Sequence, residues 1–333
     1  MNKKILIIVF AFATVCVGAN AQPKEGGHCP SPIYSRDFSK MEVLDTTRLR
    51  VRYAFCAEKI DDPKTYIDLQ RLDVGKRVVK YYSQFVYLSD SLVTLWWKEN
   101  KGARSGTSWL GEGGREKGQW SEYEWSDYFF ENGKLTEYCQ MPLWLNKYNS
   151  WYTEPAPKQQ WTLSLTPTPS PVGEGNYRRE RDKDSSADNQ TPLPHGGGAG
   201  GEAVILGYKC QRATCRFRGR DFEAWFAPSI PVKRGPWKFQ GLPGLILKVY
   251  DKDKLYTFEA IGLETRQYPI TRFKQSKEYS RSTREKVWKM QRQWHENWFK
   301  AVDYHKATMD ASGNMIPGEA VSIYTPYNPL ELE

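Results

Sequence analysis

The chain has 333 residues, of which 39% are hydrophobic and 26% charged, and its formal net charge is +9. The length fits one large or two ordinary domains, and the composition is that of a globular protein rather than a disordered chain. Only one apolar run exceeds ten residues, so the chain is not a membrane protein with several transmembrane helices. Aromatic residues make up 14% of the chain, which is enough apolar surface for a large core and a binding face.

Residues 1–21 have the pattern of a secretory signal peptide. A basic start and an apolar run lead to an Ala-Asn-Ala cleavage site at residues 19–21. We therefore expect an exported mature chain without a transmembrane segment, beginning at Gln22 and located in the periplasm, at the outer-membrane periphery or outside the cell. The alternatives are an uncleaved anchor, for which the run is short, and a lipid-modified Cys16, which the β-branched Val15 before it disfavours.

Five cysteines remain after this cleavage: Cys29, Cys56, Cys139, Cys210 and Cys215. An oxidising compartment favours one or two disulfides, and the odd number leaves at least one thiol unpaired. The pairing cannot be read from the sequence. Cys210 and Cys215 lie in an expected strand that would hold them roughly 16 Å apart, too far for a disulfide unless the strand bulges.

Apolar side chains alternate with a period of two in the first half of the chain, which predicts strands. Residues 83–97 are ambiguous, because their leucines approach helical spacing. Residues 100–118 read as an exposed loop. The Asn132-Gly133 pair predicts a hairpin turn within residues 127–135. Further strands are predicted at residues 49–55, 66–72 and 76–82, the last two joined at Gly75.

Residues 166–203 differ in composition from the chain on either side. These 38 residues include seven Gly and five Pro but no Trp, Phe or Ile, so they cannot offset the entropy of ordering. We interpret them as a disordered insertion in a hairpin loop of a single domain formed by residues 22–165 and 204–333. A linker between two domains is the alternative. A long loop costs little, because closure entropy grows only logarithmically with length.

The second half predicts strands more clearly. Pro243 presets the backbone of a type II turn, and Gly244 would accept the positive φ that such a turn needs. This turn leads into an apolar strand. Ser282 and Glu285 form a capping box at the start of an amphipathic helix that continues to Ala301. Residues 306–333 read as a loop. The predicted strands are at residues 206–218, 221–227, 245–250 and 255–262.

Taken together, these elements predict an α+β fold, mostly antiparallel β, with one C-terminal helix. Residues 241–246 read GLPGLI. With the motifs around it, the chain resembles the GLPGLI family of exported bacterial proteins, met most often in Bacteroidetes. The resemblance extends over residues 45–332 and is most specific at residues 204–262. It implies a curved open sheet shaped as a half-barrel or bowl. It also implies that the strand at Trp161 runs almost directly into the strand at Ile205. The supporting motifs are at residues 206–213, 217–220, 224–226, 235–239, 282–288 and 327–332.

No catalytic motif is present. The sequence lacks HExxH, a G-x-S-x-G elbow and a phosphate loop. We therefore predict no catalytic residues, metal or cofactor, and the sequence favours a protein that is not an enzyme. A Cys210–His295 pair or an unselected pair of carboxylates leaves a hydrolase acting on envelope or glycan substrates as an alternative. The family is largely uncharacterised, so the resemblance transfers no catalytic residue.

Trp225, Trp237 and Phe239 are the candidate binding residues, because Trp combines a large area with one polar handle; core packing is the plainer interpretation. The function expected first is a carrier or binding protein for an apolar ligand, lipid or peptide. The alternative is an assembly or accessory partner of an outer-membrane complex, which would show an exposed apolar patch without a pocket. The basic excess would allow peripheral contact with a membrane, but a solvated surface of mixed charge is the plainer interpretation; no nucleic-acid-binding motif is present. Gly241, Leu242, Pro243, Gly244, Leu245 and Ile246 form a structural motif, a turn followed by a buried strand.

Overall fold

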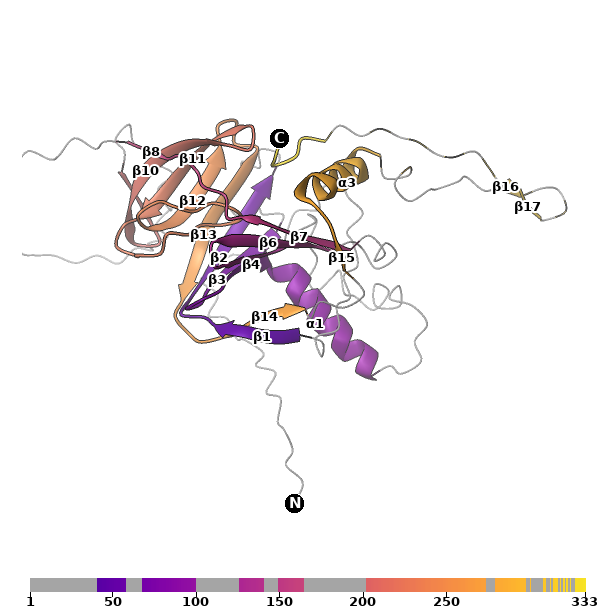
Figure 1. The fold of residues 1–333 in the computed structure, drawn as a ribbon, viewed down its shortest axis with the longest axis horizontal. Coiled ribbons are helices and arrows are strands. Elements are labelled where there is room, and N and C mark those ends of the chain that lie inside the picture. Colours follow the sequence, from indigo (N-terminus) through magenta and orange to yellow (C-terminus); the bar gives the residue numbers. More distant parts are fainter. Residues whose placement is uncertain are drawn as a thin grey trace, which may run out of the picture.

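The computed structural model describes residues 41–57, 68–99, 126–140, 149–164, 202–273, 279–297 and 327–333, together with residues 300, 308–309, 312, 314–316, 318, 320, 322 and 324. The helices in this part are α1 (Gln84–Glu99) and α3 (Arg284–Glu296) (Figure 1). The strands are β1 (Met41–Thr46), β2 (Leu49–Ala57), β3 (Asp68–Val74), β4 (Val79–Ser83), β5 (Asp127–Glu131), β6 (Lys134–Cys139), β7 (Ser150–Pro155), β8 (Thr162–Leu163), β9 (Glu202–Ile205), β10 (Tyr208–Phe217), β11 (Arg220–Ala227), β12 (Leu245–Asp251), β13 (Tyr256–Glu264), β14 (Pro269–Phe273), β15 (Ser280–Arg281), β16 (Thr308–Met309) and β17 (Met315–Ile316).

One large sheet dominates the fold, and its order is β15-β7-β6-β5-β4-β3-β2-β13-β12-β11-β10-β8, with β9 also paired to β10. Neighbouring strands in it are antiparallel except for the short parallel β15–β7 pair. The sheet is open, because β15 and β8 at its two ends do not pair with each other. The prediction of a mostly antiparallel, open β fold with few helices and one C-terminal helix is confirmed at this level.

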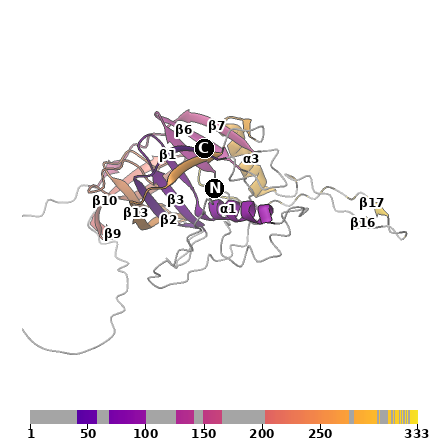
Figure 2. The ribbon, with the colours of Figure 1, turned by 90° about the horizontal axis from the view of Figure 1, so that it is seen from below.

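The strand direction turns along the sheet. Figure 1 shows β6 and β7 running across the view while β2 and β13 run steeply, as the right-handed twist of strands requires. In both Figure 1 and Figure 2 the helices lie toward the β7 end of the molecule, away from β10. Val287 and Trp294 of α3 are buried in a small cluster with Tyr152 of β7.

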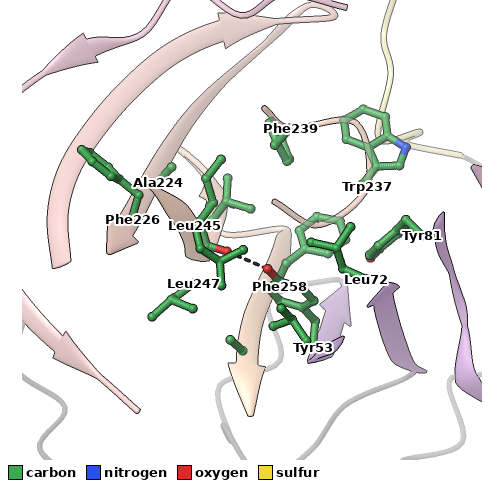
Figure 3. Close-up of a cluster of buried hydrophobic side chains, with 14 of the residues drawn as sticks. Tyr53, Leu72, Tyr81, Ala224, Phe226, Trp237, Phe239, Leu245, Leu247 and Phe258 are labelled. Carbon is green, nitrogen blue, oxygen red and sulfur yellow. Dashed lines mark hydrogen bonds between the residues drawn. The ribbon is translucent and has the colours of Figure 1, made fainter. Parts of the chain in front are cut away.

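The loop between β11 and β12 fills the centre of the hydrophobic core. Trp237, Phe239 and Leu242 from this loop are buried against side chains from both halves of the sheet. Figure 3 shows Trp237 and Phe239 beside the strand residues, and the Phe239 and Phe258 rings are 6.4 Å apart. The Tyr53 hydroxyl donates a 2.7 Å hydrogen bond to the Ile246 carbonyl, so even this buried polar group has a partner.

Two-residue turns with positive φ connect several strands. The hairpin predicted at Asn132-Gly133 is confirmed, with φ of 50° and 72°. Leu206 and Gly207 also have positive φ, at 51° and 81°, which is the geometry of a type I′ hairpin. The prediction of one strand over residues 206–218 was therefore wrong at its start, because β9 and β10 meet in a turn there.

The GLPG segment needs glycine for a different reason from the one expected. Positive φ occurs at Gly241, with 97°, and not at Gly244, so the predicted type II turn is wrong. A Cβ on Gly244 would lie only 2.3 Å from the carbonyl oxygen of Ala227. Gly244 therefore allows two backbone segments to approach each other closely.

The structure also tests the predictions for the two helices and for the last residues of the chain. The ambiguous segment at residues 83–97 falls largely in α1, and the Ser83 hydroxyl caps this helix by accepting a 3.1 Å hydrogen bond from the Val86 amide. The cap of α3 is Thr283 rather than Ser282. The last residues, expected as a loop, dock on the sheet, and the Leu332 amide donates to the Arg218 carbonyl at 3.0 Å.

We expect Gly244→Ala to lower the free energy of unfolding by about 1–3 kcal/mol, because the added methyl group must displace a backbone carbonyl. Urea unfolding followed by Trp fluorescence measures this loss. The exposed neighbour Pro243→Ala is the control and should change stability less. Equal stability of Gly244→Ala and the wild type would contradict the close approach.

Candidate functional site: a buried ionic network at Lys238

Lys238 lies between Trp237 and Phe239 in the loop that joins β11 to β12, which we call the core loop. Its side chain is only 3% exposed. Its ammonium nitrogen is 2.9 Å from Oε2 of Glu137 and 2.5 Å from Oε1 of Glu331, and it donates to the Tyr152 hydroxyl at 3.2 Å. An ammonium group has three N–H donors, so all of them have acceptors here. A buried lysine is tolerated only when its charge is compensated in this way.

The two carboxylates are also fully engaged. Glu137 accepts hydrogen bonds from the Ser126 hydroxyl at 2.8 Å and from the Tyr152 hydroxyl at 2.5 Å. Oε2 of Glu331 accepts from both Nε and Nη2 of Arg284, at 3.0 and 2.5 Å, so these charge-assisted bonds share one oxygen. Each carboxylate therefore compensates Lys238 and is itself held by a second element.

Arg218 in the β10–β11 turn extends the network. Nη2 of Arg218 is 3.2 Å from Oε1 of Glu154 on β7, and Nε of Arg218 is 3.9 Å from Oε2 of Glu331. The network then contains three cations and three carboxylates, so its formal charges balance. It joins elements distant in sequence: β6, β7, the core loop, α3 and the C-terminal segment. The six charged members are Glu137, Glu154, Arg218, Lys238, Arg284 and Glu331.

The surroundings stabilise the charged forms of the central groups. Burial alone would lower the pKa of Lys238, but the charges of Glu137 and Glu331 outweigh it, so its pKa lies above the usual value. Burial would raise the pKa of Glu331, but Lys238 and Arg284 outweigh it and lower that pKa. Burial, followed by the charge of Glu137, raises the pKa of Tyr152, which therefore remains a hydrogen-bond donor.

A small cavity of about 60 Å³ adjoins the network. It has room for about two water molecules, whereas small-molecule sites usually measure about 300–1,000 Å³. Glu137 and Glu331 converge on Lys238 beside it, but both carboxylates are paired with cations. A lysine whose pKa is raised is also not prepared to act as a nucleophile. The cavity is lined by Tyr128, Glu137, Tyr152, Trp237, Lys238, Arg284, Val287, Trp288, Gln291, Arg292, Tyr327, Pro329, Leu330 and Glu331.

The structure places the three candidate binding residues in the core. Trp237 is 2% exposed, and its ring lies 5.3 Å from that of Phe239 in an edge-to-face contact. Trp225 is buried on β11, and its indole N–H donates to Glu223 at 3.2 Å. Of the three, Trp237 alone lines the cavity. Contact of these residues with a ligand remains a prediction, and their observed role is packing.

The residues of the ionic network were not selected from the sequence. Glu137 follows the polar Thr136 in its strand, and Glu331 lies close to the chain end, so neither stands out. A signal was present at Lys238, because a charged residue between Trp237 and Phe239 in an apolar segment must have a compensating partner. The identity of the partner could not be read, since it lies about a hundred residues away in each direction.

The structure tests part of the prediction that the cysteines form disulfides. Cys210 and Cys215 are buried free thiols and form no disulfide. Burial raises the pKa of Cys210 to about 11 and that of Cys215 to about 12, so neither is a thiolate at neutral pH. Cys29 and the side chain of His295 lie outside the described part of the chain. Within that part, no cluster of three or more His, Cys, Asp or Glu residues is arranged for a metal ion.

Comparison with known proteins gives one short family match. Residues 218–248, which contain Lys238 and the GLPGLI run, match a family model described as "Protein of unknown function (Porph_ging)". The chain is thus similar in this stretch to a family of unknown function, and the GLPGLI name is not confirmed. A comparison with curated proteins finds no match.

Two solved structures, titled "Structure of PNGF-II in P21 space group" and "Structure of PNGF-II in C2 space group", are similar at TM-scores of 0.43 and 0.42. Each is 11% identical, and the match covers 76% of this chain but 34% of theirs. This chain therefore matches only about a third of their length, and a likeness this distant does not indicate a function. In the described residues, neither helix is long and apolar enough to cross a bilayer.

We expect Lys238→Met to lower the free energy of unfolding by about 3–5 kcal/mol, because it leaves Glu137 and Glu331 buried without their shared cation. Denaturant unfolding measures the loss. Lys289→Met is the matched control, since Lys289 forms an exposed ion pair with Glu285, and its unfolding midpoint should not change measurably. Similar midpoints for the two variants would contradict a central role for the network.

Stability should also depend on the charge of Glu331. Because the pKa of Glu331 is lowered in the folded state, its contribution is present above the ordinary carboxyl pKa and is lost as the pH falls through the lowered value. We expect Glu331→Gln to show a shallower loss of stability on acidification than the wild type in urea unfolding between about pH 7 and 3. The exposed Glu131→Gln should retain the wild-type slope.

Proposed function

We propose that this protein is a non-enzymatic component of the bacterial cell envelope that acts as an accessory or assembly partner of another envelope protein. It contacts that partner through the open edge of the large sheet formed by β8, β9 and the β9–β10 turn, which we call the β8–β9 edge. The proposal that the chain is exported rests on the signal-peptide pattern of residues 1–21.

The observation that carries this proposal is the grouping of exposed apolar side chains on the β8–β9 edge. Val204 is 68% exposed, and Leu163, Leu206 and Tyr208 on the same edge are also exposed. Large apolar side chains gathered on a surface favour contact with another molecule over contact with water. These exposed side chains support the assembly-partner alternative, which expects an exposed apolar patch.

The backbone of the β8–β9 edge also suits a partner strand. Within the described residues, β8 and β9 end the sheet and no further strand pairs with their outer side. Natural edge strands usually carry Lys, Pro or a bulge that prevents pairing with other chains. β8 and β9 contain neither Lys nor Pro, and Glu202 is their only charged residue. We infer that the occupant is an extended strand of the partner protein.

The carrier alternative is less well supported, because the protein's own loop occupies the interior that an apolar ligand would need. Trp237 and Phe239 fill it, and Gln159 and Trp161 hold the loop in place. The Gln159 side chain donates to the Lys238 carbonyl at 3.1 Å, and the Trp161 indole donates to the Gln240 carbonyl at 2.8 Å. Peripheral contact with anionic lipid would be compatible with this arrangement and with the net charge, which is +9 for the full sequence and +7 without Lys3 and Lys4 of the signal peptide.

Site-specific photo-crosslinking in the native cell tests the proposal. A benzophenone amino acid is placed at Val204, and at Ile261 as the control, because Ile261 is 42% exposed on a strand that is paired on both sides. We expect a discrete crosslink from position 204 to another envelope protein, identified by mass spectrometry, and none from position 261. A crosslink only to a second copy of this chain, the same products from both positions, or no product from position 204 would overturn the proposal.

A further inference from the structure

We propose that β8 and β9 are two parts of one edge strand, and that the 37 residues from 165 to 201 are an insertion that the fold does not require. This inference goes beyond the proposed function and does not depend on it. It concerns the same β8–β9 edge and rests on the pairing of the described strands.

The register of the two strands is the first observation. On β8, Thr162 pairs with Thr214 and Leu163 with Ala213, and the Ser164 amide donates to the Arg212 carbonyl at 3.0 Å. On β9, the pairs run from Glu202 with Gln211 to Ile205 with Tyr208, in the same antiparallel direction. Ser164 and Glu202 therefore lie opposite Arg212 and Gln211, which are consecutive residues of β10.

No residue of β10 is skipped or shared between the two pairings. If Ser164 were bonded directly to Glu202, a single antiparallel strand would pair with β10 from Thr214 to Tyr208 without a change of register. Two strands of independent origin would have no reason to meet at consecutive positions, because a slip of one residue moves every side chain to the other face.

The alternation of hydrogen-bonded pairs along β10 also agrees with one continuous partner strand. The turn at Leu206 and Gly207 has the two positive φ values of a type I′ hairpin, which is closed by a hydrogen-bonded pair, here Ile205 with Tyr208. Hydrogen-bonded pairs of antiparallel strands recur at every second residue, so the next ones on β10 fall at residues 210 and 212. The bond from Ser164 to Arg212 lies in this phase, on the far side of the 37-residue segment.

The position and composition of the segment explain why the fold accepts it. The segment begins and ends at an edge strand, so it interrupts no pairing between interior strands of the sheet. The entropy cost of closing a loop also grows only slowly with its length. In sequence, residues 165–201 contain seven Gly and five Pro and no Trp, Phe or Ile, so they bring little apolar surface to a core. The interruption also falls within a strand rather than in a hairpin loop, and Glu202 and Ala203 belong to β9.

A deletion series tests the inference. A variant lacking residues 165–201 joins Ser164 to Glu202 in register. Variants lacking residues 165–200 or 165–202 are matched controls that place the rest of the strand one residue out of register. We expect the in-register deletion to keep the near-ultraviolet circular dichroism of the full chain and to unfold in urea at the same or a higher midpoint, with both controls lower. Hydrogen exchange should show the Ser164 amide at least as protected as in the full chain.

Two outcomes would overturn the inference. The first is an in-register deletion that unfolds at a clearly lower urea midpoint than the full chain, or that fails to fold. The second is a series in which all three deletions have the same midpoint, because the register would then carry no information. Crosslinking from Val204 in the in-register deletion keeps this result separate from the proposed function, since the partner contact can be lost while the fold is retained, or the reverse.

Discussion

The compensation of one buried charge organises the centre of this protein. The Lys238 ammonium lies in the interior, where an isolated charge would be prohibitively costly, and two carboxylates from distant parts of the chain surround it. Meeting that requirement fixes the position of β6, of the C-terminal segment through Glu331, and of α3 through Arg284. A buried ion pair adds little net stability compared with an apolar core, but it makes misplacement of any one partner expensive.

The same loop that carries Lys238 decides what the sheet can do. An open sheet with one aromatic face would suit an apolar ligand, but Trp237 and Phe239 pack against that face as part of the core. Our proposal therefore places recognition at the edge of the sheet. There the exposed Val204 lies on strands that lack the Lys and Pro residues by which many edges resist pairing.

The elements that could be predicted are those specified by local chemistry. Alternating apolar residues identified β2, β3 and β12, and the Asn132-Gly133 turn was correct because its backbone conformation is a property of those two residues. Local reasoning failed at Gly244, where the need for glycine comes from the approach of the Ala227 carbonyl and not from φ. It also failed at Leu206, since a leucine with positive φ is not suggested by its type.

By itself, the sequence determined the β-rich class, the positions of most strands along the chain, and the start of the C-terminal helix to within one residue. It also showed that residues 166–203 differ in composition from the chain on either side. These features depend on periodicity, turn chemistry and composition, which act over a few neighbouring residues. Only the tertiary structure decided that Lys238 meets Glu137 and Glu331, and that Ser164 and Glu202 face consecutive residues of β10. Both depend on contacts between residues far apart in the chain, and the physical reason is that charge compensation and strand register are settled only when the distant segments come together.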